Sequence, residues 1–202
     1  TMVNVQSGSL TIAPTLYAGR IRYDPEKDLL PVTGTVKATF ILTANPAMPF
    51  SDIKSFIAYS KANPKKGAVA HMPGAAYLGA LRFRIATGAD TELIPYKGQQ
   101  QIWTDLLGGR LWGGIEPVGG VLPQIRAGKL KGIAILGAQR SALLPDVPTS
   151  GEQGFPGLEA DAWNALFMKA GTPPAIIERL NRDIVRILST PDIRDGLAKQ
   201  GM

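Results

Sequence analysis

Between residues 69 and 119 the sequence alternates short apolar runs with helical segments that glycines interrupt. The pattern predicts strands over 68–71, 92–95 and 111–116, each followed by a helix, over 77–85, 99–107 and 118–127, and then a fourth strand over 132–136. Apolar strands that alternate with helices of roughly ten residues indicate a parallel sheet built by right-handed crossovers. In such sheets, ligands bind at the carboxyl ends of the strands. We therefore expect the functional site at that edge.

The composition is that of an ordinary globular protein. The 202 residues can form one large domain or two small ones with sizeable cores. Because the chain has no cysteine, a disulfide scaffold and a thiol nucleophile are excluded. The sequence has no apolar run of about 18 residues, so we expect no membrane-spanning helix.

The net charge of +6 is concentrated in one part of the chain. Residues 51–140 hold twelve Lys or Arg and five Asp or Glu, whereas the remainder holds ten and eleven. A basic lobe is typical of proteins that bind an anionic ligand or nucleic acid, and it is also compatible with a solvated surface without function. The positive residues are scattered and do not alternate with aromatic ones, so nucleic acid is not the expected partner.

The flanking segments predict further elements. A strand is expected over 3–6, followed by a Ser7-Gly8-Ser9 loop and a short helix or turn over 10–16. Strands are also expected over 35–44 and 160–167. Helices are expected after Ser51, which can provide the N-cap, and after Thr172, and a last helix after Thr190. The helix after Thr172 has an apolar stripe that should be buried, made of Ile176, Ile177, Leu180, Ile184 and Leu188. Thr149 and Glu152 match the capping-box pattern.

His71, the only histidine, lies where the first strand of the central region gives way to its helix. A general base would need a nucleophile or an orienting acid, and a metal site would need further ligands; none is near in sequence. We expect a structural histidine or, as the alternative, one that lines a ligand cleft. No catalytic or metal-binding residue is predicted.

The neighbouring segment from Pro73 to Ala76 is a stronger candidate. Small residues at the start of a helix let a ligand approach unpaired backbone amides, and the helix dipole favours negative charge there. The same residues could form an ordinary tight turn. At the other end of the chain, the Ser7-Gly8-Ser9 loop offers hydroxyls and amides that also suit an anion, or it is a plain turn.

Glu116 and Pro117 end the third strand. A carboxylate at this edge could repel a simple dicarboxylate, or it could bind an amine, a hydroxyl or a water molecule. An exposed glutamate without function is equally compatible with the sequence.

Several ordered motifs carry a family resemblance. Residues 94–98 (IPYKG), 105–109 (DLLGG), 122–130 (LPQIRAGKL) and 140–149 occur in one order, with further matching pieces at 16–17, 23–29, 62–64, 170–174 and 179–181. This set resembles the extracytoplasmic solute-binding proteins of tripartite tricarboxylate transporters, often called the Bug family. The resemblance covers essentially the whole chain. Asp105 belongs to a helical packing motif within it.

The resemblance implies an α/β fold of the periplasmic-binding-protein type II class, with two lobes of parallel-rich sheets joined by a hinge. It implies a first lobe of residues 1–41 and 138–202 and a second lobe of 42–137. Residues 1–202 would then lack the first part of the mature protein, the export signal and the last helix. We expect such a fragment to fold poorly and to bind weakly.

The resemblance also implies the function: a non-enzymatic, monomeric periplasmic receptor without cofactors, which binds a small organic carboxylate and delivers it to membrane permease subunits. The ligand-binding residues expected from the motifs and their positions are Ser7, Gly8, Ser9, Ala70, His71, Pro73, Gly74, Ala75, Glu116 and Pro117. The family has a Ser/Gly/Thr-rich loop where this chain has residues 71–76, and commonly a histidine where it has Tyr77. Main-chain amides can still bind a carboxylate without those hydroxyl and histidine side chains, but the preferred ligand can differ from that of the family.

Two other functions remain open from the sequence. A ligand-sensing domain of a regulatory or signalling protein can share the two-lobed architecture. An enzyme acting on a phosphorylated or carboxylated metabolite would need an acid–base or metal set that the sequence does not supply.

Overall fold

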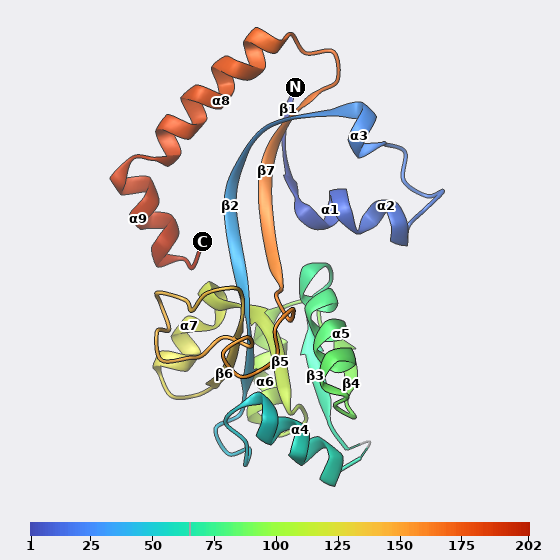
Figure 1. The fold of residues 1–202 in the computed structure, drawn as a ribbon, viewed down its shortest axis with the longest axis vertical. Helices are drawn as coiled ribbons and strands as arrows, with labels where there is room; N and C mark the ends of the chain where they lie inside the picture. Colours follow the sequence, from blue (N-terminus) through green and yellow to red (C-terminus); the bar gives the residue numbers. More distant parts are fainter. Residues whose placement is uncertain (65) are drawn as a thin grey trace. The chain divides into compact units, whose positions relative to one another are not determined.

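The computed structural model describes residues 1–64 and 66–202, which form two compact units (Figure 1). Unit 1 comprises residues 1–37, 162–200 and 202, and unit 2 comprises residues 38–161 and 201. Two strands, β2 (Leu29–Ala44) and β7 (Asp161–Lys169), contribute residues to both units. The sequence-based lobes differ from these units mainly in residues 138–161, which belong to unit 2. As a functional division, those lobes stay a prediction.

Unit 2 is a mixed α/β layer structure. After β2 come α4 (Ile53–Ala62), β3 (Ala68–His71), α5 (Ala75–Thr87), β4 (Glu92–Pro95), α6 (Gln99–Leu107), β5 (Gly113–Pro117), α7 (Val118–Arg126) and β6 (Lys131–Leu136). The strand–helix alternation predicted over 69–119 is therefore confirmed. The main shift is at α5, which begins at Ala75 rather than at Tyr77.

The sheet of unit 2 is less parallel than predicted. Strand β3 is parallel to both β4 and β5, as expected. However, β2 pairs antiparallel with β5 and with β6, so the expected fourth parallel strand is separated from the other three. The expectation of a parallel sheet was wrong at this point. Hydrophobic periodicity identifies strands, but it does not specify which strands become neighbours.

Both faces of this sheet are covered. The adjacent β2 residues Ile41 and Leu42 point to opposite faces, and both are fully buried. On α6, Ile102 and Leu106 are four residues apart and also fully buried, which explains why this segment forms an amphipathic helix. Phe56 packs edge-to-face against Phe83 at 5.3 Å between ring centroids.

Unit 1 contains β1 (Met2–Gln6), α1 (Ser7–Thr11), α2 (Ala13–Leu16), α3 (Pro25–Asp28), α8 (Pro174–Leu188) and α9 (Pro191–Lys199). Strand β1 pairs antiparallel with β7, from Met2 opposite Met168 to Gln6 opposite Asn164, and β7 lies beside β2. Residues 7–9, expected as a loop, instead form the first turn of α1.

The apolar stripe of α8 is not buried as predicted. Ile177, Leu180, Ile184 and Leu188 are half-buried, and Ile176 is 47% exposed. Periodicity predicts which face of a helix is apolar, but not how much partner surface covers that face. The helix is nevertheless attached to β2, because Asn181 Nδ2 donates to the backbone oxygen of Val32 at 2.7 Å.

Two predicted caps differ in detail. Helix α4 is capped by Asp52, not Ser51: Asp52 Oδ1 accepts from the Ser55 amide at 2.7 Å, and the Ser55 hydroxyl oxygen accepts from the Asp52 amide at 3.2 Å. The residue before α8 is Pro173, while the Thr172 hydroxyl donates back to the Lys169 oxygen. In the described part of the chain, every helix is too short or too polar to cross a membrane.

The capping-box pair at Thr149 and Glu152 is confirmed in its hydrogen bonds. Glu152 Oε2 accepts from the Thr149 amide at 2.7 Å, and Thr149 Oγ1 accepts from the Glu152 amide at 3.1 Å. Turns rather than a helix follow it, so the pair stabilises a turn here.

Candidate functional site

The parallel strands β3, β4 and β5 end at one edge of the sheet in unit 2. His71, the last residue of β3, lies opposite Pro95 of β4 and Ile115 of β5. Helices α5, α6 and α7 begin a few residues beyond these strand ends. The first-turn amides of a helix lack partners within it, and they carry the positive end of its dipole. The carboxyl edge of β3, β4 and β5 therefore favours negative charge.

The start of α5 has a backbone conformation that favours glycine. Gly74 precedes the helix with φ 83° and ψ −131°, a conformation that residues with a Cβ atom rarely adopt. No described atom lies within 4 Å of the position that a Cβ would take there. Among the described residues, no side chain caps this helix, so its first amides are not occupied by a capping oxygen. Gly74 and Ala75 are half-buried and Pro73 is exposed.

His71 and Ala70 lie inside the unit rather than at its surface. Ala70 is fully buried and His71 is 4% exposed. His71 Nδ1 is 3.0 Å from the backbone oxygen of Met72, which can only accept, so Nδ1 carries the hydrogen. Burial lowers the pKa of His71 below its usual value. This histidine is therefore neutral at pH 7, and its ring lies 4.9 Å from that of Tyr77.

Glu116 is the most unusual group at this edge. Its side chain is fully buried and accepts from three donors: Thr43 Oγ1 at 2.9 Å, Trp103 Nε1 at 2.7 Å and, more weakly, Gln99 Nε2 at 3.4 Å. Burial raises the pKa of Glu116 to about 7, and the three hydrogen bonds oppose that rise. The sequence allowed an exposed carboxylate here, and the structure instead shows an interior one. Pro117 follows it as the residue before α7.

The packing around Glu116 depends on a glycine in the same strand. A Cβ on Gly114 would lie 3.0 Å from Ile102 Cγ2, 3.2 Å from Glu116 Oε1 and 3.3 Å from Thr43 Oγ1. A side chain at this position would press on both partners of the Glu116–Thr43 hydrogen bond and would require them to shift by a few tenths of an ångström.

A surface hollow of about 500 Å³ adjoins the start of α6. Two of its lining residues, Gln99 and Trp103, are also the donors to Glu116, and Lys97 gives it a positive charge. The full lining is Lys97, Gly98, Gln99, Gln100, Gln101 and Trp103.

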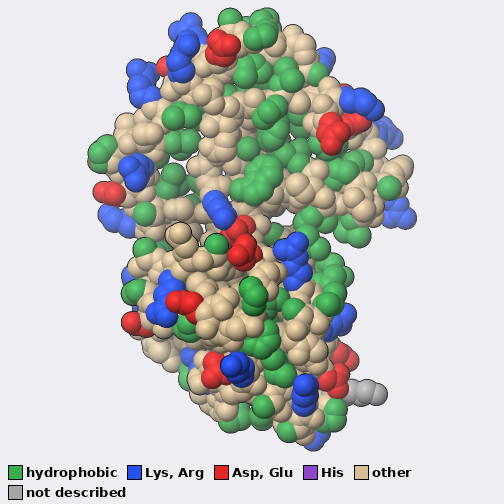
Figure 2. Space-filling view, viewed as in Figure 1, with side chains coloured by type: hydrophobic (Ala, Val, Ile, Leu, Met, Phe, Trp, Pro, Cys, Tyr) green, Lys and Arg blue, Asp and Glu red, His purple; other side chains and the backbone are tan. Residues whose placement is uncertain are grey.

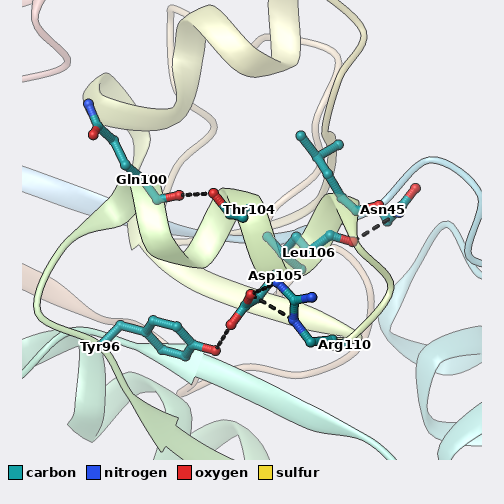
Figure 3. Close-up of polar contacts among 8 residues, drawn as sticks. Asn45, Tyr96, Gln100, Thr104, Asp105, Leu106 and Arg110 are labelled. Atoms are coloured by element: carbon teal, nitrogen blue, oxygen red, sulfur yellow. Dashed lines mark hydrogen bonds and ion pairs between the residues drawn. The ribbon is translucent and has the colours of Figure 1, made fainter.

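The family motifs at residues 94–98 and 105–109 have a structural role (Figure 3). The Tyr96 hydroxyl donates to Asp105 Oδ2 at 2.5 Å, and Arg110 Nε donates to Asp105 Oδ1 at 2.8 Å. Burial, with Asp105 adding to it, raises the pKa of Tyr96 to about 12, while Tyr96 and Arg110 lower that of Asp105. Asn45 Nδ2 donates to the Leu106 oxygen at 2.9 Å and thereby occupies a carbonyl at the end of α6. These residues fix the loop before α6 and the end of α6.

The candidate residues Ser7, Gly8 and Ser9 belong to unit 1. Ser7 is buried, and its Oγ accepts from the Trp163 amide at 3.3 Å. Ser9 is exposed, and its backbone oxygen accepts from the Tyr23 hydroxyl at 2.6 Å. Of this group, only Ser9 presents an exposed hydroxyl.

Sequence reasoning missed the three donors to Glu116. Thr43 lies about seventy residues away in sequence, and no local signal links it to Glu116. Gln99 and Trp103 could have been paired with each other, because residues four apart share one face of a helix. Within the described residues, no cluster of three or more His, Asp or Glu side chains could hold a metal ion.

The fold is the mixed α/β fold of periplasmic binding proteins. The structure superposes on "Structure of a periplasmic transporter" with a TM-score of 0.85 and 31% identity, covering all of this chain and 68% of that one. It superposes on MatC from Rhodopseudomonas palustris with bound malate with a TM-score of 0.82 and 28% identity, covering all of this chain and 69% of that one.

The family follows from the sequence comparison. The model of the tripartite tricarboxylate transporter family receptor matches residues 1–202, and the chain belongs to that family. Protein BugT of Bordetella pertussis is 37% identical over 183 residues, which are 90% of this chain and 56% of BugT. The chain spans between 55% and 59% of the first curated relatives that it matches. The Bug-family resemblance of the motifs is therefore confirmed.

Proposed function

We propose that this chain is part of a periplasmic receptor that binds a small organic carboxylate and delivers it to the permease subunits of a tripartite tricarboxylate transporter. Family membership supports the role, and a dicarboxylate such as malate is the first candidate because MatC has bound malate. The observation that carries the proposal is the uncapped start of α5 at Gly74. It offers main-chain amides to a carboxylate without any hydroxyl side chains.

The proposed site combines two lobes, 1–41 with 138–202 and 42–137, that close on the ligand about a hinge where the chain crosses between them, near residues 41–42 and 137–138. The second lobe would line the ligand with residues 70–75, where Gly74 and Ala75 would supply the amides, and with the edge at Glu116 and Pro117. The first lobe would supply the turn at Ser7, Gly8 and Ser9. Three or four charge-assisted hydrogen bonds contribute on the order of 5–12 kcal/mol in total. Association costs about 4–15 kcal/mol, so one lobe alone leaves too little for micromolar affinity, which needs about −8 kcal/mol.

The face of the molecule drawn in Figure 2 gives no support to a nucleic-acid partner. Figure 2 shows Lys and Arg side chains interspersed with Asp and Glu on the face in view, without one continuous basic patch. We further propose that the receptor acts as a monomer without cofactor or catalytic step.

Thermal-shift measurement of the full-length protein against a panel of organic acids tests the function. We expect at least one di- or tricarboxylate to raise the melting temperature. If none of the carboxylates does so, the proposal fails.

The role of Gly74 is tested by Gly74→Ala with Gly88→Ala as the matched control. Both glycines flank α5 and have positive φ, 83° and 61°, so both changes introduce backbone strain; the strain is larger at Gly74, whose ψ of −131° lies outside the left-handed helical region that Gly88 occupies. We expect Gly74→Ala to weaken carboxylate binding about tenfold or more in calorimetry, as loss of a charge-assisted hydrogen bond would. Gly88→Ala should leave the affinity unchanged. Equal affinities of the two variants would contradict the role of this turn.

A further inference from the structure

The carboxyl of Glu116 lies beside a hydroxyl that has two acceptors within reach. Thr43 Oγ1 is 2.9 Å from Glu116 Oε1 and 3.1 Å from the backbone oxygen of Gly114. A hydroxyl has one hydrogen to donate and can also accept. Thr43 can therefore donate fully to only one of the two oxygens at a time.

This geometry satisfies Glu116 in both of its protonation states. When the carboxyl is ionised, Thr43 donates to Oε1. When Oε1 carries a proton, that proton is donated to Thr43 Oγ1, and the Thr43 hydroxyl turns to the Gly114 oxygen. Trp103 Nε1 donates to Oε2 at 2.7 Å in both states. Proton uptake therefore leaves no buried polar atom of this group without a partner. The free-energy penalty of an unpaired buried donor or acceptor is thus avoided.

The charge state of Glu116 is set by its surroundings rather than by an ion pair. Its raised pKa has burial as its cause, opposed only by the hydrogen bonds from Thr43, Trp103 and Gln99. The nearest strand neighbour that titrates, His71 on β3, is neutral at pH 7. The other ionisable residues on the elements packed around β5 are Lys37 on β2, Glu92 on β4, Arg82 and Arg84 on α5, Asp105 on α6, and Arg126 on α7.

We propose that Glu116 takes up one proton from solvent when an anion binds at the carboxyl edge of β3, β4 and β5, with the Thr43 hydroxyl turning to satisfy the neutral acid. The inference rests on the proposed function, because it requires a carboxylate at this edge. Glu116 lies two residues before the first residue of α7, Val118, and thus at the same edge. A ligand carboxylate at this edge raises the free energy of a second negative charge nearby. Glu116 can relieve this by taking up a proton, because its neutral carboxyl is buried and already has hydrogen-bond partners.

Calorimetric titration of the full-length protein with malate, in buffers of different ionisation enthalpy, measures the protons taken up. With the pKa of free Glu116 at about 7, uptake should be about half a proton at pH 7 and close to one at pH 8. The affinity should fall about 16-fold between pH 7 and pH 8.5, because only the protonated form binds tightly.

Two variants assign the proton. Glu116→Gln carries an amide that reproduces the hydrogen bonds of the neutral acid, with its oxygen toward Trp103 and its NH₂ toward Thr43. It should bind malate without proton uptake and with an affinity independent of pH over this range. Glu92→Gln, at an exposed glutamate of β4, is the matched control and should take up protons as the wild type does.

The outcomes are separable. Malate binding with no proton uptake by the wild type overturns the inference and leaves the proposed function standing, as does uptake that persists in Glu116→Gln. Failure of every carboxylate to bind overturns both. If Glu116→Gln does not fold, ¹³C NMR of wild type labelled at the glutamate carboxyl decides: the one resonance that titrates near pH 7 should shift its midpoint upward with malate, and an unmoved midpoint refutes the proposal.

Discussion

Glu116 shows how one side chain can be both well bonded and costly to ionise. Desolvation acts on the whole charge, whereas the bonds from Thr43, Trp103 and Gln99 recover only part of that free energy. The result is a carboxyl whose pKa lies near 7 instead of its ordinary value of 4.5. That difference also makes the stability of the protein depend on pH.

The sign of this dependence follows from proton binding. Between about pH 4.5 and 7 the folded state holds the Glu116 proton and the unfolded state has released it, so stability falls as the pH rises. The wild type should lose about 3 kcal/mol relative to Glu116→Gln across this window, and little more above it. Urea denaturation of both proteins at pH 5 and pH 8 measures this difference. A difference between the two proteins that stays constant with pH would show that Glu116 ionises normally.

At the scale of single elements, the residues that cap the helices and the pairing of the strands differed most from the sequence-based expectation. Helix α4 begins where Asp52 and Ser55 bond each other reciprocally, whereas the sequence pattern predicted the N-cap at Ser51. The three helices α5, α6 and α7 formed where glycine and proline flanked apolar periodicity, because those residues limit where a helix can begin or end.

The cap of α4 gives a direct comparison. Asp52→Ala removes the oxygen that accepts from the Ser55 amide and should cost about 1 kcal/mol of unfolding free energy. Ser51→Ala, one residue earlier, should change it by less than about 0.5 kcal/mol. Chemical denaturation of the two variants checks this. Equal losses would mean that the helix is capped differently from the structure described above.

At the scale of the whole molecule, the two compact units share β2 and β7 rather than being joined by a single linker. Strand β2 lies beside β7 and also pairs with β5 and β6 of unit 2 through residues 40–44, whereas β7 contributes only Asp161 to unit 2. Under the proposed function, a bound ligand should stabilise the folded state by mass action.

The expected size of that stabilisation can be stated. At a malate concentration one hundred times Kd, the free energy of unfolding should rise by about 2.7 kcal/mol. For a protein of this size class that corresponds to roughly 5–10 °C in Tm. Differential scanning calorimetry of the full-length protein over a malate series measures it, and a Tm that does not follow the concentration dependence calculated from Kd would exclude simple one-site binding.

The amino-acid sequence by itself determined the strand–helix alternation of residues 69–119, the family, and the edge at which a ligand is expected. These properties depend on local periodicity, on glycine and proline positions and on motif order, all of which lie along the chain. The capping pair at Thr149 and Glu152 was predictable for the same reason, although a turn and not a helix follows it.

Only the tertiary structure decided the insertion of β2 among the predicted parallel strands, the half-exposed stripe of α8 and the environment of Glu116. Each depends on contacts between residues far apart in sequence, such as Thr43 with Glu116. Burial and pKa follow from the surrounding atoms, and these are set by packing rather than by neighbours along the chain.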